Sequence, residues 1–174
     1  MGESTHDTGE SASHARSTVT PWIGGALGGV AGALVLGVLL WLAEPAIVEA
    51  SIPALYGLDP TPVGGWVLHL LHGAIIGLVF AAVTERRIVR TYLEADVETQ
   101  ALRFAGAPLR TAGFGVVFGL AIWAVLPLIV MPLWIGMVGD PDVPVMPDLI
   151  VESLLGHLLY GAIVGAVYGA IVRR

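Results

Sequence analysis

The chain has 174 residues, of which 56% are hydrophobic and 13% are charged, and its mean hydropathy is +0.83. Soluble domains carry about 25% charged residues, so this composition excludes an ordinary water-soluble domain and indicates an integral membrane protein. The net charge of -6 argues against a nucleic-acid partner, and the absence of cysteine excludes disulfides, thiolate metal sites and thiol nucleophiles.

Residues 1–20 are rich in Ser, Thr, Gly, Glu and His and contain almost no large apolar side chains. Such a segment cannot bury enough surface to offset the entropy of ordering it. We therefore expect a disordered cytoplasmic tail, followed by a single membrane domain over residues 21–174. His6 and His14 of the tail lack acidic or cysteine partners at ligand spacing and do not predict a metal site.

Four apolar stretches are each long enough to cross a hydrocarbon core, which takes roughly 20 helical residues. They cover residues 22–43, 66–84, 111–136 and 149–172. The expected fold class is therefore an all-α membrane protein with four transmembrane helices.

The connection between the second and third stretches, residues 85–104, is predicted to be an amphipathic helix. Its apolar residues recur at helical spacing, and its charged residues lie on the other face. Two locations suit such a helix: the membrane surface at one end of the bundle, which we favour because interfacial helices are common, or the surface of a partner. The apolar positions are Val89, Tyr92, Leu93, Val97, Ala101 and Phe104.

All eight basic residues are arginines, and a four-span topology puts every one of them on the same side. Positively charged segments are retained in the cytoplasm. We therefore expect a multi-pass protein of the cell membrane with both termini cytoplasmic. The connections on the opposite side carry only acidic charges, at Glu44, Glu49, Asp59, Asp140, Asp142 and Asp148.

A motif in the second span recurs in the fourth. Residues 69–77 read HLLHGAIIG, and residues 157–165, which lie 88 positions later, read HLLYGAIVG. A shift of 87 residues likewise superposes Gly28 and Gly32 on Gly115 and Gly119. The sequence therefore predicts two tandem helix-pair repeats of the same orientation, as in a parallel duplication.

Glycines at every fourth position line up along one ridge of each helix. Small residues at this spacing let membrane helices approach closely. We expect these ridges to be packing surfaces, directed either at the other repeat or at another chain. The packing glycines are Gly28, Gly32, Gly73, Gly77, Gly115, Gly119, Gly161, Gly165 and Gly169.

His69 and His157 lie at matched depth, roughly 25 Å from the arginine side at about 1.5 Å per residue. A histidine in a span is costly unless it is paired, and three interpretations follow. Each could be a neutral imidazole bonded to a backbone carbonyl, a water or Ser153. The pair could be axial ligands of a b-type haem, a cofactor-binding site. His69, His72, His157 and Glu152 could instead form a proton or cation relay in a small ion or solute transporter.

The sequence contains no Ser-His-Asp order, His-Glu-x-x-His helix or phosphate loop. We therefore expect a non-enzymatic protein with no metal and, the haem alternative aside, no cofactor.

Through its lysine-free, acidic polar segments and the repeated motif, the stretch 20–174 resembles uncharacterised small four-span membrane proteins of halophilic archaea, a resemblance that implies no activity. We expect a protein that packs in the lipid bilayer through its glycine ridges, as a homo-oligomer or as an accessory subunit of a larger membrane complex.

Overall fold

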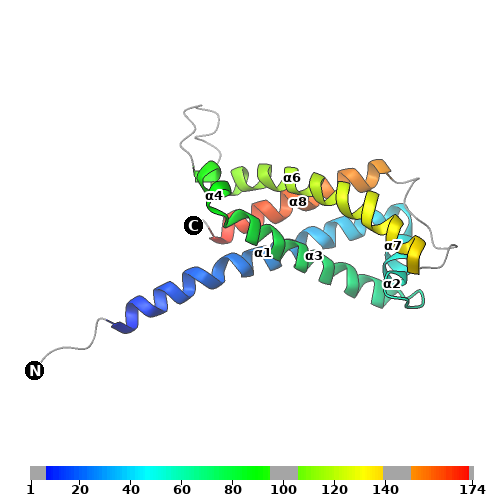
Figure 1. Cartoon of the computed structure of the whole chain (residues 1–174), viewed down its shortest axis with the longest axis horizontal. Coiled ribbons are helices and arrows are strands. Elements are labelled where there is room, and N and C mark those ends of the chain that lie inside the picture. Colours follow the sequence, from blue (N-terminus) through cyan, green and yellow to red (C-terminus); the bar gives the residue numbers. More distant parts are fainter. Residues whose placement is uncertain (1–6, 95–105, 139–149, 173–174) are drawn as a thin grey trace, which may run out of the picture.

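The computed structural model describes residues 7–94, 106–138 and 150–172, and these residues form an all-helical fold (Figure 1). Four long helices make up its body: α1 (Asp7–Ala43), α3 (Pro62–Thr84), α6 (Ala107–Val125) and α8 (Ile150–Val172). The shorter helices are α2 (Ile52–Ala54), α4 (Arg87–Glu94) and α7 (Met131–Val138), and two π-helical turns are η1 (Ile47–Ser51) and η2 (Leu126–Val130).

The four expected spans are present as helices long and apolar enough to cross a membrane: Thr20–Ala43, Pro62–Thr84, Pro108–Trp134 and Ile150–Val172. The second begins earlier than predicted. Pro62 occupies its first turn, where the missing N–H costs nothing, and Thr61 Oγ1 accepts a hydrogen bond from the Gly64 N–H at 3.4 Å. This N-cap extends the helix beyond its apolar stretch.

The segment expected to be a disordered tail differs from that expectation. Helix α1 begins at Asp7, so residues 7–20 continue the first span as helix and residues 1–6 lie outside the described part of the chain. Once an apolar span has formed, each added helical residue gains one backbone hydrogen bond, a term that an argument from burial alone omits.

The predicted amphipathic connector is described only in part. Helix α4 covers Arg87–Glu94, directly after the second span, and residues 95–105 lie outside the described residues. An amphipathic helix over residues 85–104 therefore stays a prediction.

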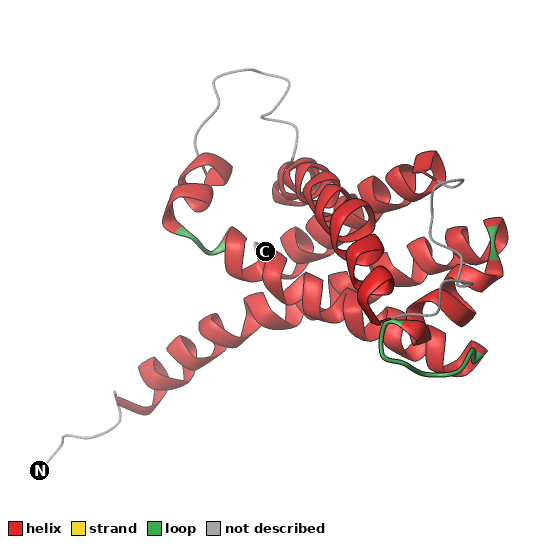
Figure 2. Cartoon of the chain, turned by 45° about the vertical axis from the view of Figure 1, so that its right-hand side comes forward, coloured by secondary structure: helices red, strands yellow, loops and turns green. Residues whose placement is uncertain are grey.

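The long helices pack side by side in the order α3, α1, α8, α6 (Figures 1 and 2). The contacts between α1 and α3 and between α6 and α8 depend on glycine. A Cβ added to Gly29 would lie 2.1 Å from the carbonyl oxygen of Gly73, and one added to Gly115 would lie 2.0 Å from that of Gly161. Neither interface has room for a side chain at these positions.

Helix α1 carries a second glycine face, directed at α8. A Cβ on Gly28 would lie 3.0 Å from the Val164 carbonyl oxygen, and one on Gly32 would lie 2.9 Å from that of Tyr160. Gly29, rather than Gly28, thus faces α3 as Gly115 faces α8. The glycines of the ridges contact helices of the same chain, and the tandem duplication itself stays a prediction.

The other packing glycines also lie inside the bundle. Gly77 fits against α1, where an added Cβ would lie 2.1 Å from the Gly25 carbonyl oxygen. Gly119 and Gly165 have the same kind of contact across the α6–α8 interface, at 2.1 Å from the His157 oxygen and 2.0 Å from the Thr111 oxygen. Gly169 is buried in α8.

A cluster of aromatic rings joins the edge helices α3 and α6. Phe80 is fully buried, and its ring centroid lies 5.7 Å from that of Phe114, 5.2 Å from Phe118 and 5.5 Å from Tyr168. The Tyr168 hydroxyl donates to Glu85 Oε1 at 2.5 Å. These contacts tie α3, α6 and α8 together near the last turns of α3 and α8.

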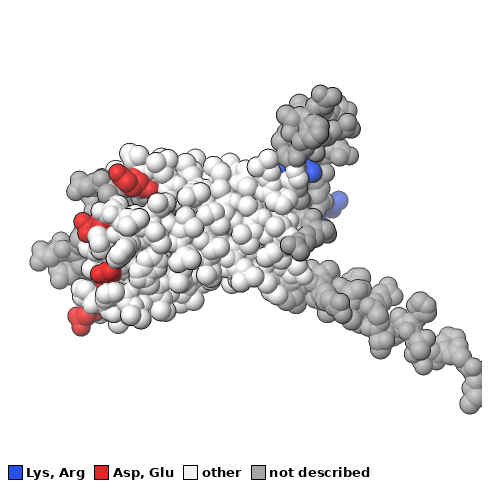
Figure 3. Space-filling model, turned by 180° about the vertical axis from the view of Figure 1, so that it is seen from behind, with Lys and Arg blue, Asp and Glu red and all other residues white. Residues whose placement is uncertain are grey.

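Charges gather at the two ends of the bundle and leave a broad uncharged belt between them (Figure 3). We call one end the arginine end, where Glu85 also lies and pairs with Arg90 at 3.4 Å. The arginine end contains Arg86, Arg87, Arg90 and Arg110, and the opposite, acidic end contains Glu44, Glu49, Asp59 and Glu152. This distribution is compatible with an integral membrane protein, because uncharged surface is what a hydrocarbon core requires.

Candidate ligand-binding cavity

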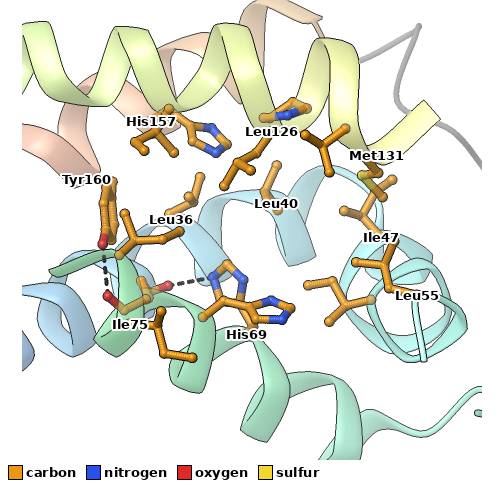
Figure 4. Close-up of a pocket in the computed structure, with 18 of the residues that line it drawn as sticks. Leu36, Leu40, Ile47, Leu55, His69, Ile75, Leu126, Met131, His157 and Tyr160 are labelled. Atoms are coloured by element: carbon orange, nitrogen blue, oxygen red, sulfur yellow. Dashed lines mark hydrogen bonds between the residues drawn. The ribbon is translucent and has the colours of Figure 1, made fainter. Parts of the chain in front are cut away.

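A cavity of about 530 Å³ lies between the edge helices, on the acidic side of the Phe80 cluster (Figure 4). Small-molecule sites in proteins typically enclose about 300–1,000 Å³, so this volume suits a small ligand. The walls are mostly aliphatic, with side chains from α1, α3, η1 and the third span. Representative lining residues are Leu36, Leu40, Ile47, Ile76, Leu126 and Met131.

Local backbone irregularities lie in the walls of this space. The third span passes through η2, whose Pro127 has no N–H to donate, and Leu126, Pro127 and Val130 of this turn line the cavity. Ile47 of η1 lines it from the other side. π-Helical turns of this kind widen a helix locally and occur often at functional sites.

His69 reaches the cavity from α3. Its Nε2 donates to the backbone carbonyl of Ala33 on α1 at 2.8 Å. The ring lies edge-on to Trp66, with centroids 6.2 Å apart, and packs against Gly37, where an added Cβ would come within 2.7 Å of it. The histidine is thus held between two helices.

His157 reaches the same cavity from α8. Its Nδ1 donates to the backbone carbonyl of Ser153, one turn earlier, at 2.7 Å. The Ser153 hydroxyl is buried and has no hydrogen-bond partner among the described residues. Both histidines therefore have one of the partners that the sequence suggested, a main-chain carbonyl, and the structure brings the two predicted positions to one cavity.

Two tyrosines of the cavity were not predicted as site residues from the sequence. Tyr160 donates its hydroxyl proton to the Gly73 carbonyl at 2.9 Å, and the Tyr56 hydroxyl is hydrogen-bonded to His72 Nε2, with the two rings stacked. A signal for Tyr160 was present, because it occupies in the second motif the position of His72 in the first. No comparable pattern pointed to Tyr56.

The polar relay is only partly assembled. His72 and His157 line the cavity, whereas the Glu152 side chain is exposed at the acidic end and is not part of the lining. The described residues also contain no group of three His, Cys, Asp or Glu side chains that could hold a metal ion.

The two histidines differ in which ring nitrogen is left to coordinate a haem. A ligating histidine usually donates its other ring N–H to a carbonyl or carboxylate, which is how Ser153 holds His157. His69 instead uses Nε2 for the Ala33 carbonyl, so only its Nδ1 remains. Coordination of a haem through both Nε2 atoms would require His69 to leave Ala33.

The cavity has no charged lining residue in the described part of the chain. Its rim includes half-exposed side chains from three different segments: Tyr56 at 54%, Ile75 at 50%, Val130 at 44% and Trp134 at 49%. An apolar space with a few fixed polar atoms can bind a neutral, hydrophobic molecule and orient it. No protein-family model, curated protein or solved structure is significantly similar to this chain.

Proposed function

We propose that this chain is a non-enzymatic integral membrane protein that binds a small hydrophobic molecule in the cavity between α3 and α6. The observation that carries the proposal is an uncharged cavity of about 530 Å³ whose half-exposed rim includes Ile75, near the middle of α3. A ligand dissolved in the membrane would reach such a cavity without crossing the charged ends.

The surface around Ile75 supports this route of entry. Ile75 lies at the rim, and its neighbours one turn away on α3, Leu71 and Val79, are 52% and 46% exposed. Exposed aliphatic side chains in the uncharged belt are suited to contact with lipid chains rather than water. A hydrophobic molecule would therefore pass from lipid into the cavity along continuous apolar surface.

The glycine ridges give less support to the homo-oligomer or accessory subunit that the sequence suggested. Gly73 and Gly161 contact Gly29 and Gly115 of the same chain.

A haem remains the second candidate function, because His157 is held as ligating histidines are, but it requires His69 to release the Ala33 carbonyl. Transport would require the bound molecule to leave at a second opening.

We further propose that the protein lies in the cell membrane with its arginine end in the cytoplasm, as positively charged segments are retained there. The native chain has no cysteine, so single cysteines report on topology without interference. In intact cells, a membrane-impermeant maleimide should label Leu58→Cys, at the acidic end, and should label Ile88→Cys, in α4, only after permeabilisation. Both side chains are exposed. The reverse labelling pattern would overturn the orientation.

Binding is tested with a photoreactive hexadecanol that carries a diazirine in its chain, added to the purified full-length protein in mild detergent. Adducts mapped by mass spectrometry should concentrate on lining residues of α3, α6 and η2. Leu126→Trp, which fills part of the cavity, should lower this labelling. Val125→Trp is the matched control, because Val125 is the adjacent residue, 49% exposed, and does not line the cavity.

Two outcomes would contradict the binding proposal. One is labelling spread evenly over the apolar surface of the bundle. The other is an equal effect of Leu126→Trp and Val125→Trp on labelling of the lining residues, since a general change in the protein would then explain the loss.

A further inference from the structure

The hydrogen-bond donors inside the cavity are already in use. A carbonyl oxygen can only accept, so His69 must carry its proton on Nε2 to bond Ala33, and His157 must carry its proton on Nδ1 to bond Ser153. Both rings stay neutral, because no acidic side chain of the described lining could pair with an imidazolium. Each ring then has one nitrogen without a proton. These are Nδ1 of His69 and Nε2 of His157, and both are acceptors.

The other polar side chains of the lining follow the same pattern. Tyr160 donates to the Gly73 carbonyl at 2.9 Å, and Trp134 Nε1 donates to the Leu55 carbonyl at 2.8 Å. Tyr56 and His72 share one hydrogen bond and so keep one donor between them, at the half-exposed rim. Deeper in the cavity, the atoms that remain for a ligand are acceptors.

The histidine nitrogens are available to a ligand. No hydrogen bond of the described residues involves Nε2 of His157, and that atom is not among the buried polar atoms without a partner, so it retains accessible surface. The ring belongs to the lining of the cavity (Figure 4). A ligand that donates a proton to it would satisfy a polar atom that an aliphatic ligand would leave without a partner.

The charge of the lining restricts the donor further. An ammonium group would bring an unpaired positive charge into a space without acidic side chains, and a carboxylate or phosphate would enter one without arginine. A ketone or an ether offers only acceptors, which cannot bond to a bare imidazole nitrogen. A neutral hydroxyl group meets both conditions.

We infer that the ligand of this cavity is an apolar alcohol, whose hydroxyl proton is donated to Nε2 of His157 or Nδ1 of His69 and whose hydrocarbon part lies against the aliphatic walls. This inference rests on the proposed function and names the chemical class of its ligand. The one donor that Tyr56 and His72 keep between them can bond to the hydroxyl oxygen as the molecule passes the rim.

The test compares two competitors that differ only at the polar group. Unlabelled hexadecanol and its methyl ether are each titrated against the photoreactive hexadecanol on the full-length protein. The alcohol should compete about tenfold better than the ether, since loss of one hydrogen bond to a desolvated acceptor is worth up to about a factor of ten. Equal competition by both molecules would overturn the inference and leave the binding proposal standing.

The variant His157→Asn isolates the acceptor. An asparagine amide can still donate to the Ser153 carbonyl, as Nδ1 of the histidine does, but it does not extend to the position of Nε2. The advantage of the alcohol over the ether, measured as the ratio of the two competitor concentrations that halve the labelling, should shrink towards one in this variant. A second variant, His69→Asn, is measured in the same way, so misfolding of one does not end the test.

The outcomes separate the two proposals. Cavity labelling that neither competitor displaces contradicts the binding function and the inference together. Displacement by both molecules with equal strength contradicts the inference alone, and so does an alcohol preference that survives in the variants of both histidines.

Discussion

Gly115→Ala is expected to destabilise the bundle far more than the same substitution at an exposed glycine. The new Cβ would lie 2.0 Å from the carbonyl oxygen of Gly161, and that oxygen belongs to the backbone of α8, which cannot turn aside as a side chain could. Helix α6 would have to move away from α8 along much of their shared length. Overpacking of this kind costs about 3 kcal/mol, and a thermal or SDS-induced unfolding curve in mild detergent would measure the loss.

Gly113→Ala is the matched control on the same helix. No atom lies within 4 Å of a Cβ at this position, so alanine meets open space. Alanine also favours a helix over glycine by up to about 1 kcal/mol in water, so Gly113→Ala should unfold like the wild type or slightly later. Equal loss of stability in both variants would show that the close approach of α6 and α8 is not what makes Gly115 necessary.

Phe80→Ala is expected to have the second large effect. Phe80 is fully buried and contacts Phe114, Phe118 and Tyr168, so its removal would leave a cavity where α3 meets α6. Truncation of a buried phenylalanine typically costs about 3–5 kcal/mol. The same unfolding measurement applies, and hydrogen exchange should rise in the last turns of α3.

The neighbouring substitution Val79→Ala provides the control for this cluster. Val79 is 46% exposed on the same helix, and shortening it removes no contact of the Phe80 rings. A loss of stability as large as that of Phe80→Ala would contradict the role of the aromatic cluster in joining the edge helices.

The two histidines show what a sequence pattern can predict and what it cannot. The repeated motif predicted that His69 and His157 lie at matched depth, and both line one cavity. The pattern left the partners open among a carbonyl, a water and Ser153. Ala33 is on another helix, 36 positions from His69, so its carbonyl could be assigned only once α1 and α3 were placed together.

Glu152 shows that closeness in the sequence does not predict a shared environment. It lies about one turn before His157 in the sequence, which suggested a shared relay. The helix directs the two side chains differently: His157 is buried and lines the cavity, whereas Glu152 is exposed. Separation along a helix gives the distance between two residues, but the environment of each depends on which neighbouring helix covers that face.

The sequence by itself determined the four apolar helices and the gathering of the arginines at one end, because hydropathy and charge act through local composition and the thickness of a hydrocarbon core. It also indicated that glycines recur on helix faces. The tertiary structure decided which faces meet, so that Gly29 rather than Gly28 contacts α3. It alone decided the cavity, whose lining combines residues of α1, α3, α8 and the third span with residues of the two π-helical turns. Such contacts join residues far apart in the chain, and their geometry is set by packing, which no local pattern encodes.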